Sequence, residues 1–211
     1  MHDPRTRALP SLGGRGMHRH RSGVQGNARL TAITGTVLFV LLAAEGLTIL
    51  RVRALLSPHV FIGMMLIPPV ALKLGSTVYR FGRYYLRHPH YRRKGPPPLV
   101  LRLLGPVVAA TTVAVLASGV ALVYVPRSDR ATVLFLHQAS FVVWFAATAI
   151  HVLGHAGEAA RLTAADLVGR TRRAVTGATF RWVALALSLL AGIGLGVVVV
   201  GRAAAYVVSV R

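Results

Sequence analysis

The 211-residue chain contains no cysteine and only five acidic residues, against 25 lysines and arginines. The lack of cysteine excludes disulfides, iron–sulfur clusters and thiolate metal sites, so any metal site must depend on histidine. The shortage of acidic residues gives a formal net charge of +20. In a soluble protein this charge would favour a nucleic-acid ligand. Hydrophobic residues, however, make up 54% of the chain, which points away from an ordinary soluble domain.

Long apolar runs predict an all-α integral membrane protein. A spanning helix needs about 20 mostly apolar residues, and the sequence has five such runs, at Leu30–Leu50, Pro58–Tyr79, Leu103–Val125, Thr132–His155 and Trp182–Gly201. We expect a four-helix core over residues 30–155, a cytoplasmic amphipathic connector over residues 156–181, and a fifth helix with a short outer tail over residues 182–211. Residues 1–29 are expected to be a disordered, basic cytoplasmic tail. The GIGLG segment of the fifth run, Gly192–Gly196, is expected to let helices approach closely.

The basic residues are unevenly divided between the two sides that this topology creates. Eighteen of the 25 fall on the side of the N-terminus, six fall on the opposite side, and Lys73 lies within a span. The positive-inside rule then predicts a multi-pass protein of the inner (plasma) membrane, with the N-terminus in the cytoplasm and the C-terminus outside. Anionic lipid head groups account for the charge, so we expect a lipid bilayer and no nucleic acid as partner.

A weak internal repeat relates the first four runs. The segment AEGLTIL in the first run corresponds to ASGVALV in the third, and HVFIGMMLIPPVALK in the second corresponds to HQASFVVWFAATAIH in the fourth. The alignment pairs Gly46 with Gly119, His59 with His137, and Lys73 with His151. The sequence therefore predicts two helical hairpins and one extra C-terminal helix.

The histidines of the second and fourth runs indicate a functional site, because ionisable side chains in hydrocarbon are costly. His137 and His151 are fourteen residues apart, which is close to four helical turns, so both lie near one helix face about 21 Å apart. The second and fourth spans run in the same direction, which brings His59 and His137 to the same side of the membrane. This geometry suits haem iron bound by imidazole from both faces. Gly46 and Gly119 are expected to give the porphyrin room near that level.

The inner side of the predicted bundle is less regular. His151 is available as a haem ligand, but its counterpart in the repeat is Lys73. We interpret Lys73 as a haem propionate partner or a side chain that reaches the head groups, in preference to a direct iron ligand. His155 is expected at the inner surface. Zinc binding by His151 and His155 is disfavoured, because no acidic partner is near in the sequence.

Glu45 is the only carboxylate within a span. It is a candidate proton acceptor at an outer quinone site, or a hydrogen-bond partner that orients a ligand imidazole. The simpler interpretation, which the sequence slightly favours, is a carboxylate neutralised by Arg51 or Arg53.

These residues resemble the membrane-embedded b-type cytochromes, in particular the bacterial di-haem cytochrome b subunits of formate dehydrogenases and hydrogenases. The resemblance covers roughly Leu30 to His155. It lies in a four-helix core, histidines near helix ends and a glycine-bearing helix before each histidine helix. It implies haem b and electron transfer between a quinone pool or periplasmic carrier and a partner oxidoreductase. Carried over by position, it implies His59 and His137 as ligands of an outer haem and His151 as a ligand of an inner one, with Lys73 where a fourth histidine is expected.

The sequence is also compatible with other classes of function. The chain is more typical of an electron-transfer subunit than of a stand-alone enzyme. The main alternative is an accessory or structural membrane subunit with a degenerate cytochrome b scaffold. A small transporter ranks lower, because so few polar residues in the spans offer little lining for an aqueous path.

Overall fold

The computed structural model describes residues 13–86 and 99–208, with side chains described for residues 23–86 and 99–202. The described chain forms helices and contains no strand, so the all-α prediction is confirmed. The helices are α1 (Gly13–Ile49), α2 (Leu56–Tyr85), α4 (Leu99–Tyr124), α5 (Arg130–Leu167), α6 (Gly169–Arg173) and α7 (Ala178–Val208), with a 3₁₀ turn at Arg127–Asp129. In the described part, five helices are long and apolar enough to cross a membrane: α1, α2, α4, α5 and α7.

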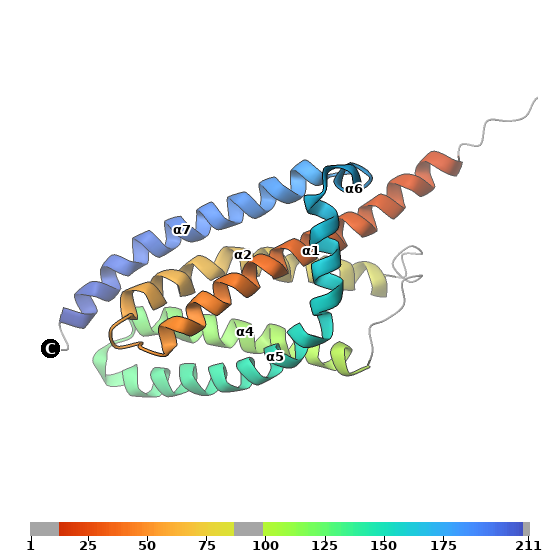
Figure 1. The fold of residues 1–211 in the computed structure, drawn as a ribbon. Helices are drawn as coiled ribbons and strands as arrows, with labels where there is room; N and C mark the ends of the chain where they lie inside the picture. The colour runs from red at the N-terminus through yellow and green to blue at the C-terminus, as the bar shows by residue number, and fades with distance from the viewer. Residues whose placement is uncertain (1–12, 87–98, 209–211) are drawn as a thin grey trace, which may run out of the picture.

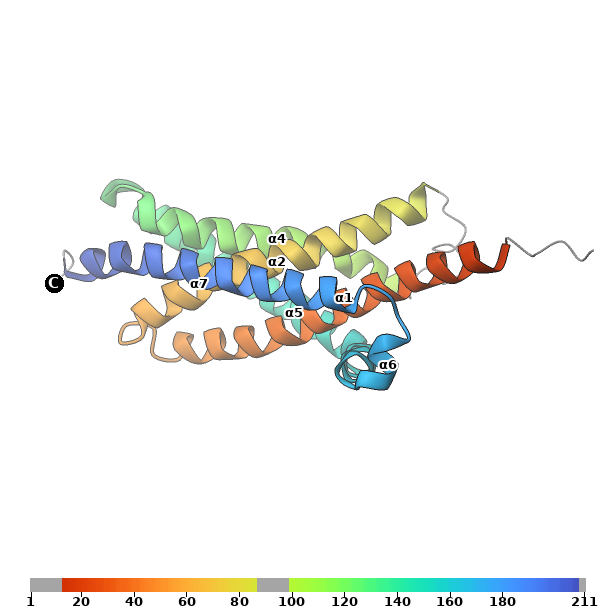
Figure 2. The same ribbon diagram turned by 90° about the horizontal axis from the view of Figure 1, so that it is seen from above.

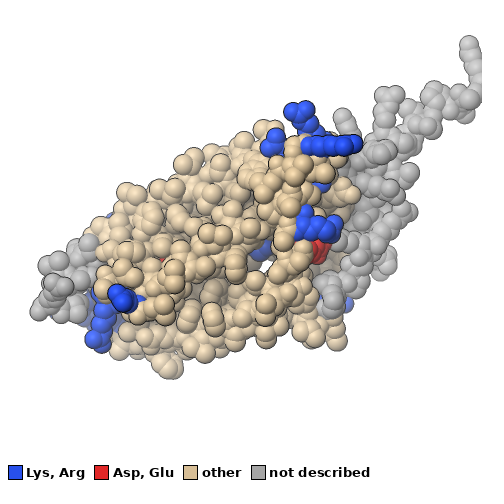
Figure 3. Space-filling model, viewed as in Figure 1, with Lys and Arg blue, Asp and Glu red and all other residues tan. Residues whose placement is uncertain are grey.

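The five long helices run up and down along one axis and form an elongated bundle (Figures 1 and 2). Residues 50–55 and 125–129 connect helices at one end, and α6 lies at the other (Figure 1). We call these the outer end and the inner end, after the predicted orientation. On the face in Figure 3, charged side chains gather mostly toward the two ends, and the surface between them is largely uncharged. Such a surface is suited to hydrocarbon along the middle of the bundle.

The structure corrects the predicted limits of the apolar runs. Helix α1 begins at Gly13, within the segment that the sequence predicts to be a disordered tail. No proline interrupts residues 13–29, and Asn27 donates a hydrogen bond to the Ser76 carbonyl of α2 at 3.0 Å, which ties this part of α1 to the bundle. The predicted extended connector at residues 88–98 lies outside the described residues.

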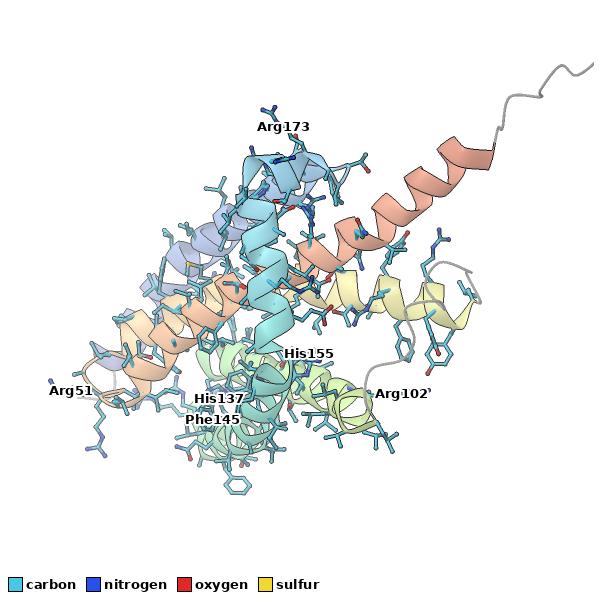
Figure 4. The ribbon with its side chains drawn as sticks, turned by 45° about the vertical axis from the view of Figure 1, so that its right-hand side comes forward. Arg51, Arg102, His137, Phe145, His155 and Arg173 are labelled. Carbon is cyan, nitrogen blue, oxygen red and sulfur yellow. The ribbon has the colours of Figure 1, made fainter. Side chains whose placement is uncertain are left out.

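The predicted connector after the fourth span is largely a continuation of α5, which runs unbroken to Leu167. Beyond the bundle core, α5 changes direction and crosses the inner end (Figure 1). Figure 4 places His155 at this change of direction, and in the sequence His155 is flanked by Gly154 and Gly157, residues at which helices commonly bend.

Helix α2 is the central helix of the bundle. It packs against α1 and α7 along much of its length and touches α4 as well. It continues through Pro68 and Pro69 and buries Met64, Leu66 and Pro69. Prolines are tolerated inside a helix in a membrane because neighbouring helices can shield or satisfy the freed backbone groups. The position of α2 explains why its residues contact three other spans.

The contact between α7 and α2 depends on glycine, as the GIGLG segment predicts. A Cβ atom at Gly192 would collide with the backbone of Met65, and one at Gly196 would lie 2.8 Å from the Phe61 ring and 2.9 Å from the Phe61 carbonyl oxygen. A Cβ at Gly194, between them, would meet nothing within 4 Å. Gly192 and Gly196 therefore form the four-residue spacing that allows close helix approach in lipid.

A buried ion cluster joins three segments at the inner end. The Asp166 carboxylate of α5 is fully buried and accepts hydrogen bonds from Arg29 of α1 at 3.1 Å and from Arg181 of α7 at 3.1 and 2.5 Å. Arg29 also donates to the Thr171 carbonyl, and Arg181 to the Thr176 carbonyl, both at 2.9 Å. Each guanidinium therefore has both a charge partner and a carbonyl partner. This cluster holds the crossing part of α5 against α1 and α7.

Substitution of the interface glycines is the first test of this packing. We expect Gly192→Ala to destabilise the protein by about 1–3 kcal/mol, because its methyl group would force α7 away from the α2 backbone. Gly194→Ala is the matched control and should be neutral or slightly stabilising, because alanine is a better helix former than glycine. Thermal unfolding in detergent, followed by circular dichroism, would measure both. Equal behaviour of the two variants would contradict the assigned interface.

The ion cluster gives a second prediction. Asp166→Asn should cost about 3–5 kcal/mol, because it leaves two guanidinium groups at the inner end without their shared negative partner. Asp129→Asn, which changes an exposed carboxylate at the outer end, should leave stability nearly unchanged. The measurement is the detergent-solubilised melting temperature of each variant. A loss no larger for Asp166→Asn than for Asp129→Asn would show that the cluster does not hold the fold together.

Candidate functional site

The inward side of α5 carries His137, Trp144 and His151 at intervals of seven residues. All three are less exposed than the residues on either side of them, apart from Val152. Trp144 donates its indole N–H to the Thr112 hydroxyl of α4 at 2.9 Å. By contrast, Phe145 is 60% exposed. The expected placement of both histidines on one helix face therefore agrees with the exposure pattern.

The imidazole rings of His59 and His137 lie next to each other, as their positions on α2 and α5 predict. Their centroids are 6.4 Å apart and their planes are inclined by 80°. Because α2 and α5 both run from the outer end to the inner end, the two residues reach the same level of the bundle (Figure 1). The structure thus brings together two residues that are far apart in the sequence.

His59 is held by two oxygen atoms from the outer end of α1. Its Nδ1 lies 3.0 Å from Oε1 of Glu45 and 2.9 Å from Oγ1 of Thr48. The Thr48 hydroxyl donates to the Glu45 backbone carbonyl at 2.6 Å, so its oxygen is free to accept from the ring. The favoured interpretation of Glu45 was wrong: in the described chain the carboxylate pairs with His59, and neither Arg51 nor Arg53 forms an ion pair with it.

His137 is held in the same way, but by neutral partners from α4. Its Nδ1 lies 3.1 Å from Oγ of Ser118 and 3.0 Å from the carbonyl oxygen of Val115. The ring also covers Gly119, where a Cβ atom would lie 3.1 Å from the imidazole Cε1. Gly119 therefore makes room for the imidazole, where the sequence predicted room for a porphyrin. A Cβ at Gly46, its counterpart in the repeat, would meet nothing within 4 Å, so space remains at that position.

The hydrogen bonds of both rings engage Nδ1, so Nε2 of each ring is the nitrogen left for a further ligand. An oxygen partner at one ring nitrogen is the usual arrangement for a histidine that binds a metal through the other. A metal ion bonded at about 2 Å to two imidazoles from opposite sides places the ring centroids about 6 Å apart. The separation of His59 and His137 agrees with this spacing.

The inner residues Lys73 and His151 form a different arrangement. The Lys73 ammonium donates to the Thr31 carbonyl of α1 at 3.1 Å and lies over Gly35, where a Cβ would be 2.7 Å from Nζ. Direct binding of Lys73 to iron would require it to leave these contacts. His151 lies within electrostatic range of Lys73, and its ring is 4.7 Å from that of His155.

Four polar atoms of the apolar runs are buried without a hydrogen-bond partner in the described structure: Oγ1 of Thr34, Oγ1 of Thr148, Nδ1 of His151 and Nε1 of Trp182. His151 thus differs from His59 and His137, whose Nδ1 atoms are both bonded. The inner position therefore lacks the support that characterises the outer pair.

Sequence reasoning missed the residues that support the two histidines, although a signal was present. In the aligned segments AEGLTIL and ASGVALV, the residue before the glycine is polar in both copies: Glu45 and Ser118. Each of these residues contacts the Nδ1 atom of the histidine in the same hairpin. A polar residue at this position of the repeat was therefore the available sign of a histidine partner.

Comparison of the chain with protein-family models, with curated proteins and with solved structures finds no match. Within the described residues, no group of three or more histidine, cysteine, aspartate or glutamate side chains is arranged to hold a metal ion. The two imidazoles would supply two nitrogen ligands to a bound metal centre.

Cross-linking offers a test of the site that does not depend on any cofactor. The chain has no native cysteine, so pairs of introduced cysteines can be read without background. We expect His59→Cys combined with His137→Cys to form an intramolecular cross-link with a short bifunctional thiol reagent. His59→Cys combined with Leu136→Cys should not, because the side chain at 136 is 53% exposed and leaves the helix on another side. Mass spectrometry of the digested protein would identify the products, and equal cross-linking of both pairs would contradict the site.

Proposed function

We propose that the protein is a b-type cytochrome of the membrane, an electron-transfer protein whose haem is bound by His59 and His137. The observation that carries the proposal is the pair of imidazoles 6.4 Å apart, with the Nδ1 atom of each engaged by an oxygen atom. This arrangement fixes the ring orientation, and Nε2 of each ring would be the atom that holds the haem. Haem, when bound, would supply an iron centre that gains and loses one electron.

The residues around the pair suit the planar, largely apolar face of a porphyrin better than a hydrated metal ion. The described residues contain no group of three or more metal-binding side chains that could hold an ion, and Glu45 already contacts His59. A Cβ atom at Gly46 of α1 would meet nothing within 4 Å, so space remains there, whereas the space at Gly119 of α4 is taken by the His137 ring. Apolar and small residues of this kind are what a porphyrin requires of its surroundings.

The proposed relation between the two hairpins supports the same function. Hairpin α1–α2 contributes Glu45, Gly46 and His59, and hairpin α4–α5 contributes Ser118, Gly119 and His137, in the same order. In each hairpin, the residue before the glycine bonds the histidine that follows on the next helix. An inverted or parallel repeat with its site at the repeat interface is common in membrane proteins. We further propose that the bundle is related to the di-haem cytochrome b subunits of formate dehydrogenases and hydrogenases.

The proposal is restricted to one haem at the outer pair. The inner residues His151 and Lys73 differ from the outer ones because Lys73 is bonded to α1 and the His151 Nδ1 atom has no partner. We propose that electrons enter or leave through a quinone pool or periplasmic carrier and pass to a partner oxidoreductase. We further propose that the inner end, with its excess of arginine, faces the cytoplasm of a cell with an inner (plasma) membrane.

A second candidate is an accessory membrane subunit built on the same scaffold without haem. The observation that favours it is the incomplete inner site, where a lysine stands opposite His151. In that case the contacts of His59 and His137 would be structural, since hydrogen bonds between spans contribute about 0.6 kcal/mol each on average.

A haem count distinguishes the two candidates. The protein is purified from a haem-sufficient host, and the reduced-minus-oxidised spectrum and a pyridine haemochrome assay are recorded. We expect one haem per chain, lost in both His59→Ala and His137→Ala and retained in His151→Ala, which is the matched control. Absence of haem from the wild-type protein would contradict the proposal and favour the accessory subunit. Haem that persists in both outer variants, or disappears only in His151→Ala, would move the site to the inner end.

A further inference from the structure

A hollow of about 220 Å³ opens at the inner end, between α1 and the turn that leads into α7. Gly23, Gly26 and Leu30 of α1 line one side of it, and Gly177 and Phe180 line the other. Gly23 and Leu30 are seven residues apart in one helix, so the hollow extends about 10 Å along the bundle. Because the side chains of Leu30 and Phe180 are apolar, the hollow suits a hydrocarbon chain that enters from the inner surface.

Glycine keeps this hollow open. A Cβ atom at Gly23 would meet nothing within 4 Å, so the surface of α1 is bare there. A Cβ atom at Gly26 would lie 3.6 Å from the Thr176 carbonyl oxygen and 3.9 Å from Val175, so the turn before α7 packs directly against α1. Gly177 has a φ of +79°, in the left-handed region that favours glycine, and the chain turns into α7 at this residue. The backbone therefore sets the shape of the hollow.

The short helix α6 brings three arginines to the same end of the bundle: Arg170, Arg172 and Arg173. Arg170 and Arg173 are exposed, and Figure 4 shows Arg173 directed away from the bundle. None of the three forms an ion pair with a carboxylate of the described residues, since the neighbouring Asp166 is fully buried and bound by the two arginines of the ion cluster. Arginine is always charged, and its guanidinium group matches the oxygen atoms of a phosphate. The charge of α6 is thus available to an anionic ligand from outside the chain.

The arginines of α6 lie close to the hollow. The Thr171 carbonyl of α6 accepts a hydrogen bond from Arg29 of α1 at 2.9 Å, so α6 is held against the helix that lines the hollow. Leu167 and Val168, directly before α6 in the chain, are both exposed. Exposed apolar side chains beside exposed arginines are typical of a surface at the boundary between hydrocarbon and lipid head groups.

We propose that the inner end binds an anionic phospholipid, with its phosphate group held by the arginines of α6 and one acyl chain in the hollow between α1 and α7. Basic pockets between spans at the cytoplasmic face bind the head groups of such lipids. Three guanidinium groups favour a lipid of net negative charge over a zwitterionic lipid, in which a second charge cancels that of the phosphate. The site is independent of the proposed haem, because it lies at the opposite end of the bundle from His59 and His137.

Quenching of tryptophan fluorescence by brominated lipid tests the proposal at the site itself. Trp182 directly follows Arg181, which borders the hollow, and the chain has only one other tryptophan, Trp144. In a Trp144→Phe background, the whole chain is reconstituted in phosphatidylcholine vesicles that contain increasing fractions of brominated phosphatidylglycerol. We expect phosphatidylglycerol to bind beside Trp182 at least about fivefold more tightly than brominated phosphatidylcholine, since one arginine near anionic lipid contributes a factor of about five.

Charge variants test the arginines. Arg170→Gln combined with Arg173→Gln should abolish the preference for phosphatidylglycerol, whereas Arg170→Lys combined with Arg173→Lys should retain a preference in the same direction. Arg51→Gln combined with Arg53→Gln removes the same charge from exposed positions at the outer end and is the matched control, which should behave as the wild type. Circular dichroism checks that each variant is folded.

A change of shape tests the hollow without changing the charge. Gly23→Leu should reduce quenching by both brominated lipids, because its side chain would occupy the place of the acyl chain. Gly194→Leu, on the exposed side of α7, is the matched control and should leave quenching unchanged. If the two variants are quenched alike, no acyl chain lies in the hollow and the site is wrong.

Three further results would overturn the proposal. The first is equal binding of the two lipids by the wild-type chain. The second is an equal loss of preference in the α6 variant and the outer-end variant, which would show only a general attraction of charge. The third is loss of the preference in excess inorganic phosphate at matched ionic strength, which would show a site for free phosphate instead of lipid. None of these readings depends on haem, so this inference and the proposed function can fail separately.

Discussion

The hydrocarbon core of a membrane offers no water to a polar side chain, so each such group must find its partner within the bundle. In this protein, the constraint fixes the outer site. His59 and His137 each direct Nδ1 at oxygen atoms of the preceding helix, and these bonds hold the two rings 6.4 Å apart. Because Nδ1 of each ring is bonded, Nε2 is the nitrogen that remains free. Two imidazoles with free Nε2 atoms close together form a candidate binding site.

The same constraint explains how the surrounding bundle is held. The contact between α2 and α7 depends on glycine and not on polar side chains. Gly192 and Gly196 let the α7 backbone approach Met65 and Phe61. At the inner end, polarity returns as the cluster of Asp166 with two arginines, which joins α1, α5 and α7. Small residues stabilise the middle of the bundle, and charged residues stabilise its inner end. Together they hold α2 where His59 lies next to α5.

Some of this architecture follows from local sequence patterns and some does not. The number of spans and the approach of His59 to His137 were predicted, because apolar run length and helix direction are local properties. The ion pair of Asp166 with Arg29 was not predicted, because the two residues are 137 positions apart and no sequence period links them. The helical start at Gly13 was also missed, because the sequence there has no apolar period. Gly119 was expected to make room for a cofactor, but it is the imidazole itself that covers it. Only the side-chain positions in the structure show which neighbouring group occupies the space that a glycine leaves.

The central proposal is that His59 and His137 together would hold one haem. Electron paramagnetic resonance of the purified, oxidised protein reads the axial ligands of such a centre directly. The account predicts a low-spin ferric signal of about one spin per chain, typical of two nitrogen ligands, which disappears when either histidine is replaced. A protein that shows no haem iron signal, or a high-spin signal that both replacements leave unchanged, would contradict the claim.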